Sequence, residues 1–331
     1  MHAGMPARFV ARRNKGVFMN QKNKLVILTG PTAVGKTALS IMLAKKIGGE
    51  IISADSMQVY KYLDIGSAKI KEAEMEGVSH HLIDALLPDK EFNVFCFQQM
   101  AKEAAQGIYE RGHIPIVVGG TGFYIQALLY DIDFSAEEDN SRIRAALEKA
   151  AAEHGNGYLY ERLKEVDADS AAAIHPNNQK RILRALEFYQ LNGFPISQHN
   201  EKERQKESAY RSCYFVLNDY RERLYQRINE RVDAMMADGL LEEVKRLREM
   251  GCKRDMLSMQ GLGYKEILAY LDGECVLEEA VAQIKQNTRH FAKRQLTWFR
   301  REKDVIWIDK PDFDYSNDKI LNFMEEKIRL L

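Results

Sequence analysis

The sequence predicts an α/β fold built on a parallel β-sheet, together with an all-helical insertion domain. Short apolar runs that end near glycines alternate with segments of helical period, a pattern typical of parallel βαβ units. A phosphate-binding motif, G-x-x-x-x-G-K-[ST], follows the first of these runs. A polar, Ala- and Glu-rich stretch of helical period then interrupts the α/β pattern from about residue 131 to residue 205. These three observations favour a P-loop NTPase-like core whose sheet is flanked by helices.

Five strands are predicted from short apolar runs, at Leu25–Thr29, Glu50–Ser53, Ile114–Val118, Cys213–Leu217 and Val305–Ile308. A helix is expected over Ala38–Ile47, because its apolar residues recur at helical spacing, and Gly48 should end it. No strand candidate occurs in residues 131–205. We therefore expect the core over residues 21–130 and 206–331 and the insertion over residues 131–205.

Length and composition exclude several classes of protein. The chain has 331 residues, of which 45% are hydrophobic and 29% charged, so it can bury a core without a disulfide or metal. Lys plus Arg and Asp plus Glu each number 48, which argues against a uniform coat of nucleic-acid-binding charge. No apolar run approaches the 18 residues of a membrane span, and the four cysteines lack zinc-site spacing. We expect a cytoplasmic protein with reduced thiols.

The N-terminal residues differ from the rest of the chain. Residues 1–18 contain four basic residues and no acidic residue, and they lack the apolar stretch of a secretory signal. A transit peptide would share this composition. We favour a disordered extension over residues 1–20, or translation that naturally begins at Met19.

The phosphate loop consists of Gly30-Pro31-Thr32-Ala33-Val34-Gly35-Lys36-Thr37. Its glycines let backbone N–H groups converge on phosphate oxygens, and the helix that follows adds the positive end of its dipole. Lys36 would bring a charge to the phosphates, and the Thr37 hydroxyl could bind Mg²⁺. The loop alone leaves open whether the phosphates belong to ATP, GTP or another diphosphate.

Two polar residues follow the next two strands, at the sheet edge where ligands bind in open parallel sheets. Asp55 could accept a proton or hold magnesium through water, or it could only cap a helix, and its position leaves both roles open. Thr121 lies in a Gly-Gly-Thr-Gly turn and could touch phosphate or substrate, or the turn could need glycine only for positive φ. The turn does not match the G-x-G-x-x-G signature of nicotinamide cofactors.

Two groups of basic residues would line helix faces. Arg223, Arg227 and Arg231 recur at spacing four and could clamp a diphosphate, or form a solvated face paired with Glu222 and Glu230. Residues 285–303 contain seven basic residues and one acidic residue. Such local charge on a neutral protein suggests a docking face for RNA or DNA, although a solvated helix would have the same composition.

An ordered set of motifs resembles the tRNA dimethylallyltransferase family. The matching segments are Gly30–Thr37, Asp55–Tyr60, Asp64–Lys69, Gly119–Tyr124, Ile174–Asn178, Arg181–Glu187, Gly261–Lys265 and Ala292–Arg300. A phosphate loop alone is shared by many families, whereas the ordered set, from about residue 24 to residue 309, is highly specific. Eukaryotic members carry a C-terminal zinc finger for which this chain has no Cys/His set, so the resemblance is to the bacterial type.

The resemblance implies transfer of a dimethylallyl group from dimethylallyl diphosphate to N6 of the adenosine just 3′ of the tRNA anticodon. The phosphate loop would then hold an isoprenoid diphosphate instead of ATP. Lys36, Thr37 and Mg²⁺ would stabilise the departing diphosphate. Arg231 would neutralise the leaving group, with Arg227 as its neighbour.

The resemblance also implies roles on the acceptor side. Asp55 would be the general base that receives the N6 proton, and Thr121 would contact the adenosine or the diphosphate. The insertion would grip the anticodon stem-loop from the other side of a monomeric protein. Contacts with tRNA are expected from Asp55, Ser56, Met57, Gln58, Thr121, Arg144, Gln179, Lys180, Arg181, Ile182, Leu183, Gln260, Gly263 and Lys265.

Two other functions are compatible with part of the sequence. A P-loop small-molecule kinase would bind ATP in the same loop and use Asp55 to orient an acceptor hydroxyl, with the insertion as a lid. The basic C-terminal segment argues against a kinase, because a small substrate does not need it. An RNA-binding module gated by a nucleotide would use that segment but would catalyse no reaction.

Overall fold

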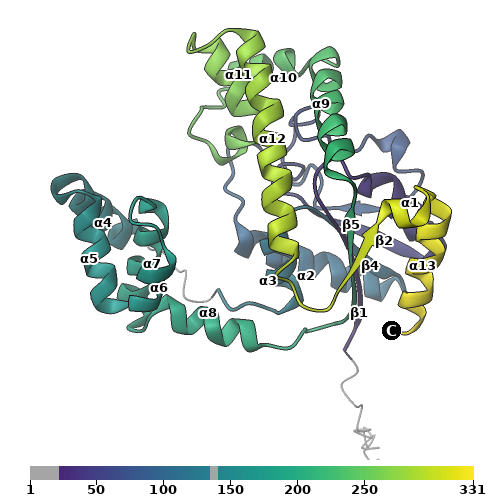
Figure 1. Ribbon diagram of the computed structural model, residues 1–331, viewed down its shortest axis with the longest axis horizontal. Coiled ribbons are helices and arrows are strands. Elements are labelled where there is room, and N and C mark those ends of the chain that lie inside the picture. The colour runs from purple at the N-terminus through teal and green to yellow at the C-terminus, as the bar shows by residue number, and fades with distance from the viewer. Residues whose placement is uncertain (1–21, 135–140) are drawn as a thin grey trace, which may run out of the picture.

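The computed structural model describes residues 22–134 and 141–331, which form a parallel sheet flanked by helices and a helical lobe beside it (Figure 1). The strands are β1 (Lys24–Thr29), β2 (Gly49–Ala54), β3 (His80–His81), β4 (Ile114–Gly119), β5 (Arg211–Asn218) and β6 (Val305–Asp309). They pair in the order β3-β2-β4-β1-β5-β6, and every pairing is parallel. The α/β fold class predicted by the sequence is therefore confirmed.

The helices occur in two groups, one within the α/β core and one in the lobe. Core helices are α1 (Lys36–Ile47), α2 (Val94–Glu110), α3 (Gly122–Leu129), α9 (Arg221–Ala237), α10 (Leu240–Glu249), α11 (Tyr264–Leu271), α12 (Leu277–Phe299) and α13 (Asn317–Arg329), with 3-10 turns η1 (Glu72–Glu74), η3 (Leu257–Gln260) and η4 (Lys310–Phe313). Lobe helices are α4 (Ser141–His154), α5 (Asn156–Val166), α6 (Ala168–Ala173), α7 (Gln179–Asn192) and α8 (Ile196–Gln205).

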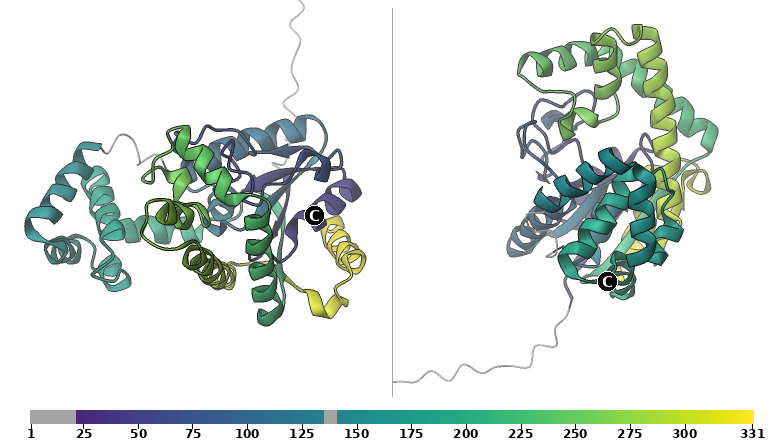
Figure 2. Two further views of the ribbon diagram at one scale, coloured as in Figure 1. Left: turned by 90° about the horizontal axis from the view of Figure 1, so that it is seen from above. Right: turned by 90° about the vertical axis from the view of Figure 1, so that its left-hand side faces the viewer.

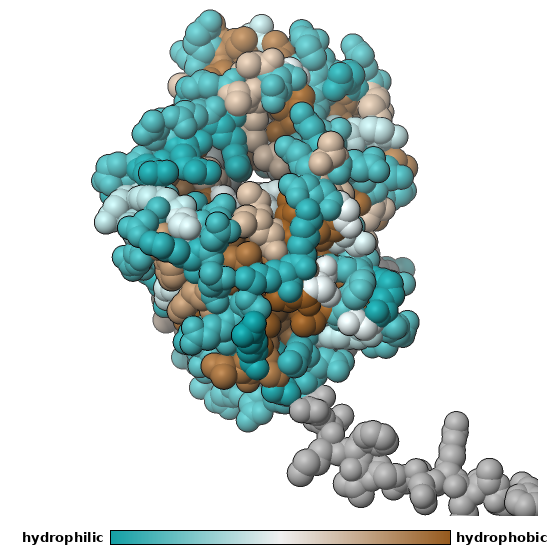
Figure 3. Space-filling model, turned by 90° about the vertical axis from the view of Figure 1, so that its right-hand side faces the viewer, coloured by the Kyte–Doolittle hydropathy of each residue, from teal (hydrophilic) through white to brown (hydrophobic). Residues whose placement is uncertain are grey.

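β1 lies at the centre of the sheet and is buried on both faces. Leu25 and Ile27 join the hydrophobic cluster on the side of α2, α3 and α12, whereas Val26 and Leu28 join the cluster on the side of α1 and α13. A strand covered on both faces needs apolar residues at successive positions, which explains the uninterrupted apolar run. The outer face on the side of α13 is largely hydrophilic (Figure 3).

The register of the sheet determines where its loops meet. Thr29 of β1 and Ala54 of β2 both pair with Gly119 of β4, so these three strands end at the same level. The phosphate loop, Asp55 and the turn with Thr121 follow these strand ends directly. The sheet therefore brings three segments that are distant in sequence to one edge.

The helical lobe has its own hydrophobic cluster. Leu147, Leu159, Leu163 and Ile182 are among its buried members, and the described chain from residue 141 to residue 205 contains no strand. Figures 1 and 2 show this lobe to one side of the sheet. The predicted N-terminal extension, residues 1–20, lies outside the described residues. In the described ranges no helix is both long and apolar enough to cross a membrane.

A buried carboxylate fixes the loop that follows β2. Glu243 of α10 is 2% exposed, and it accepts hydrogen bonds from the backbone N–H groups of Asp64, Ile65 and Gly66 at 3.1, 2.7 and 3.1 Å. The Tyr264 hydroxyl donates a fourth at 2.7 Å. One side chain therefore joins this loop to α10 and α11.

We expect Glu243→Ala to lower the free energy of unfolding by about 3 kcal/mol, because it leaves several buried donors without an acceptor. Tyr264→Phe removes a single donor and should lower it by about 1 kcal/mol. Urea denaturation followed by circular dichroism measures both. Equal effects of the two substitutions would contradict the central role of the carboxylate.

Candidate active site

The phosphate loop lies between β1 and α1, and its first glycine is required by close packing. Gly30 has φ 143°, and a Cβ atom there would lie 2.4 Å from the carbonyl oxygen of Leu217 in β5. Gly35 has φ 100° and directly precedes α1. The loop is therefore held close to β5, with its N–H groups at the start of a helix.

Lys36 folds back onto the phosphate loop. Its ammonium group donates hydrogen bonds to the carbonyl oxygens of Gly30 and Pro31 at 3.0 and 2.8 Å. Burial, and secondarily the charge of Arg231, lower the pKa of Lys36 to about 7, although Asp55 acts in the opposite direction. The Lys36 ammonium therefore titrates close to neutral pH.

The arginine face of α9 is directed at the phosphate loop instead of solvent. Arg227 Nε donates to the carbonyl of Ala33 at 2.8 Å. The pKa of Arg231 is lowered by burial and by neighbouring Arg227. A cavity of about 330 Å³ is lined by Ala33, Arg227, Glu230 and Arg231. Arg223 pairs with Asp219, with its Nε 3.5 Å from the carboxylate.

Lys310 is a cation at the loop that the sequence analysis missed. It is 8% exposed, and its ammonium donates to the carbonyl of Val34 at 3.3 Å. Burial first, and then Arg227, lower the pKa of Lys310. A single lysine between Asp309 and Pro311 matches no motif. Only the pairing of β6 with β5 brings it to the loop.

Asp55 caps a turn and lies near the phosphate loop. Its Oδ1 accepts from the N–H groups of Met57 and Gln58 at 2.8 and 3.3 Å, so it caps a turn instead of a helix. The same carboxylate lies close enough to Lys36 to raise the pKa of that lysine. Thr121 N–H donates to the carbonyl of Ala54 at 3.3 Å, which places Thr121 beside the residue preceding Asp55. The Thr121 side chain does not cap α3.

The residues present fit a magnesium ion shared with a diphosphate. Thr37 is exposed at the start of α1 and offers a hydroxyl, and Asp55 offers carboxylate oxygen. Mg²⁺ prefers oxygen ligands and commonly takes few from protein and the rest from phosphate and water. No group of three or more His, Cys, Asp or Glu residues that could hold a metal occurs in residues 22–134 and 141–331.

The predicted RNA-contact residues of the lobe divide by exposure. Gln179, Lys180 and Arg181 are exposed at the start of α7. Ile182 and Leu183 are only 0% and 4% exposed, so their side chains lie in the core of the lobe instead of on the surface where RNA would bind. Successive residues of an amphipathic helix face either the solvent or the core, and a motif match does not tell which residues face the solvent. Arg144 is exposed and pairs with Glu148 and Glu187 at 3.1 and 3.3 Å.

The RNA-contact residues predicted around α11 also include exposed and buried positions. Gln260 is exposed and Lys265 is partly exposed. Gly263 is buried, and its N–H donates to Glu266 at 2.8 Å, so it shapes the start of α11 instead of offering a contact. Ser56 and Met57 are partly exposed, next to Asp55.

Gln58 uses its side-chain amide inside the protein. Its Oε1 accepts from Ser53 Oγ at 3.1 Å, and its Nε2 donates to the carbonyls of Ser67 and Ala68 at 3.3 and 3.4 Å. The expected RNA contact would have to compete with these bonds. In the free protein, Gln58 ties the loop held by Glu243 to β2.

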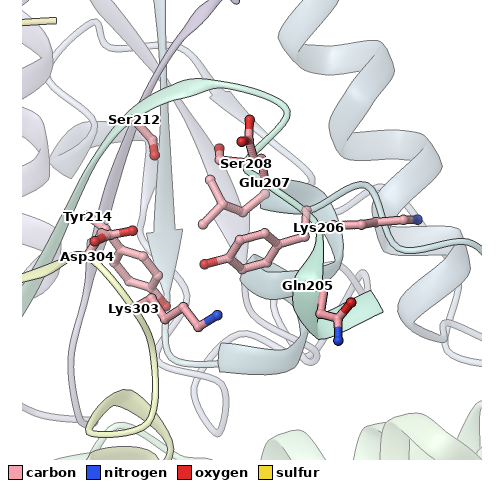
Figure 4. A pocket seen from close by; sticks show the side chains of 10 residues that line it. Gln205, Lys206, Glu207, Ser208, Ser212, Tyr214, Lys303 and Asp304 are labelled. Carbon is pink, nitrogen blue, oxygen red and sulfur yellow. The ribbon is translucent and has the colours of Figure 1, made fainter. Parts of the chain in front are cut away.

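A second cavity lies at the opposite edge of the sheet. It has a volume of about 310 Å³, and residues Gln205 to Ser208, Tyr214 and Asp304 are among those that line it (Figure 4). Tyr214 and Asp304 stand near the amino ends of β5 and β6. Ligands of open parallel sheets bind at the carboxyl ends, where the phosphate loop, Asp55 and Thr121 meet.

Comparison with known proteins agrees with this geometry. The IPP transferase family matches residues 58–302, and the isopentenyl transferase family matches residues 23–90. The tRNA dimethylallyltransferase of Lachnoclostridium phytofermentans is 59% identical over 300 residues, which are 91% of this chain and 96% of the relative.

Solved structures with similar folds have related activities. The tRNA isopentenylpyrophosphate transferase of Bacillus halodurans is 45% identical with a TM-score of 0.70, and the match covers 93% of this chain and 97% of that one. A eukaryotic dimethylallyltransferase acting on tRNA is 33% identical with a TM-score of 0.76, over 87% of this chain and 74% of that one. The chain therefore belongs to the IPP transferase family, which includes the tRNA dimethylallyltransferases.

Proposed function

We propose that this protein transfers a dimethylallyl group from dimethylallyl diphosphate to N6 of the adenosine just 3′ of the anticodon in tRNA. The observation that carries this proposal is the meeting of a cationic phosphate loop and the carboxylate of Asp55 at one sheet edge. The relatives named above are transferases that act on tRNA. A small-molecule kinase and an RNA-binding module without chemistry are accordingly not favoured.

On the donor side, the protein neutralises a leaving group. As N6 bonds to the allylic carbon, the bond from that carbon to the diphosphate oxygen breaks, and negative charge collects on the diphosphate. Lys36 and Arg231 lie where they can stabilise this charge. Arg227 supports the phosphate loop through its hydrogen bond to the carbonyl of Ala33. Mg²⁺ held by the Thr37 hydroxyl and the phosphates would add Lewis-acid stabilisation.

On the acceptor side, the protein removes a proton. A neutral exocyclic amine is a weak nucleophile and must lose a proton as the new bond forms. Asp55 would receive it, because two backbone N–H groups fix its carboxylate beside the phosphate loop, near Lys36. Thr121, beside it, would contact the adenosine or the diphosphate. The adenine would leave the anticodon-loop stack to enter the site.

The RNA would lie between the core and the lobe. Gln179, Lys180 and Arg181 on the lobe, and Gln260 and Lys265 on the core, are exposed or partly exposed where a bound stem-loop could reach them. Lys293, Arg294, Arg300 and Arg301, in α12 and just after it, are exposed for phosphate contacts. In this proposal, residues 131–205 form an insertion domain that binds the RNA, and the protein is a cytoplasmic monomer.

The proposed reaction is tested by incubating the protein and Mg²⁺ with unmodified tRNA and either dimethylallyl diphosphate or ATP. Nucleoside mass spectrometry should find an adenosine heavier by one dimethylallyl group with the diphosphate and without ATP. Turnover of ATP with no gain in mass would instead support a kinase.

Asp55→Asn should lower the single-turnover rate about 10²- to 10⁴-fold, because an amide keeps the Oδ1 acceptor but cannot take the proton. Affinity for tRNA, measured by filter binding, should change little, since the turn at residues 55–58 is preserved. A rate within threefold of the parent protein would remove Asp55 from the role of base.

The affinity for dimethylallyl diphosphate should fall as pH rises above about 7. Free Lys36 has a pKa lowered to about 7, and a bound anion raises it, so binding takes up a proton between the free and bound pKa values. The loss approaches about tenfold per pH unit in that range. Calorimetric titration without RNA from pH 6 to 9 measures it. Lys36→Arg stays charged and serves as the control for ionisation of the diphosphate itself, so parallel profiles would contradict the assignment.

A further inference from the structure

Gln295 of α12 joins two turns of the site that are far apart in sequence. Gln295 is buried in the core, with only 6% of the residue exposed. Its Oε1 accepts a hydrogen bond from the backbone N–H of Thr32, in the phosphate loop, at 2.9 Å. Its Nε2 donates to the carbonyl of Gly120, in the turn that carries Thr121, at 3.0 Å. The two ends of one amide thus hold the donor loop and the acceptor turn.

The glycines of the Gly-Gly-Thr-Gly turn are explained by this packing. A Cβ atom on Gly120 would lie 2.1 Å from Gln295 Nε2, and one on Gly122 would lie 2.2 Å from Trp298 Cδ1. Gly120 and Gly122 are absent from the residues with positive φ in the described chain. The turn therefore needs glycine because α12 lies directly against it on both sides of Thr121, and the alternative that positive φ requires these glycines is wrong.

We propose that Gln295 is a positioning residue that sets the distance and orientation of the donor loop relative to the acceptor turn. The proposal rests on the proposed function, in which the diphosphate sits at the loop and the adenosine beside Thr121 and Asp55. Transfer requires the amine to approach the allylic carbon opposite the departing oxygen. Small errors of alignment reduce such rates strongly, even when each substrate still binds.

A bridge between two sites differs in its kinetics from a residue that serves either site alone. Loss of the bridge leaves the P-loop N–H groups and Lys36 in place for the diphosphate. It also leaves Asp55 and the exposed RNA-contact residues in place for tRNA. Loss of the bridge should therefore leave the affinities for the diphosphate and for tRNA unchanged, while the rate of the transfer step falls.

The test compares Gln295→Met, which removes both hydrogen bonds at similar volume, with Gln295→Glu, which keeps the acceptor for Thr32 but places a carboxylate oxygen against the Gly120 carbonyl. Gln283→Met makes the same chemical change at an exposed position of the same helix, outside the basic segment 285–303, and is the control. Single-turnover rates are measured with both substrates saturating. Dissociation constants for dimethylallyl diphosphate and for tRNA are measured separately, and thermal melting checks that each variant is folded.

We expect both Gln295 variants to react at least tenfold more slowly than the parent protein, with each dissociation constant within about threefold and the control unchanged. An unaltered single-turnover rate in a folded Gln295 variant would overturn the proposal. A change in one dissociation constant with an unaltered rate would likewise overturn it and assign Gln295 to a single site. If Gln295→Met does not fold, Gln295→Glu decides by the same criteria. A parent protein without transfer activity would instead refute the proposed function.

Discussion

The concentration of positive charge around a single loop governs the rest of the structure. Lys36 lies inside the phosphate loop, while Arg227 and Lys310 hold the carbonyls of Ala33 and Val34. A peptide carbonyl and the N–H of the same peptide unit point in opposite directions. The cation bound to the Val34 carbonyl therefore directs the N–H of Gly35 away from itself, whereas the N–H of Val34 donates to the carbonyl of Pro31 at 3.4 Å. Asp55 offsets part of the repulsion among these cations, and a bound anion would offset more.

The parallel sheet makes this arrangement possible. Its order puts β1 between β4 and β5, so the phosphate loop has the acceptor turn on one side and the strand leading to α9 on the other. α12 packs against the same edge, where Gln295 contacts the phosphate loop and the acceptor turn and Trp298 contacts the acceptor turn. The site thus consists of side chains that precede and follow the helical lobe in the sequence.

Local patterns in the sequence predicted most of the fold, because the buried strands and the phosphate loop are specified by adjacent residues. The edge strand β3 was not predicted, since the pair His80–His81 is too short to form an apolar run. Lys310 and Gln295 were not assigned to the site, because their roles depend on contacts with Val34, Thr32 and Gly120 that no local pattern contains. Ile182 was assigned to RNA contact from its motif, whereas its place on the inner face of α7 is a tertiary property.

The pairing of β1 with β5 also has a consequence for synthesis on the ribosome. Val26 and Leu28 pair with Cys213 and Phe215, so one edge of the central strand stays unpaired until nearly 190 further residues have been added. At bacterial-to-eukaryotic elongation rates this takes roughly 10 to 40 s. The lobe is completed during this interval and can bury Leu159 and Leu163 through local contacts alone. A nascent chain at that stage carries an exposed apolar strand, which makes it a substrate for chaperones before it can become an enzyme.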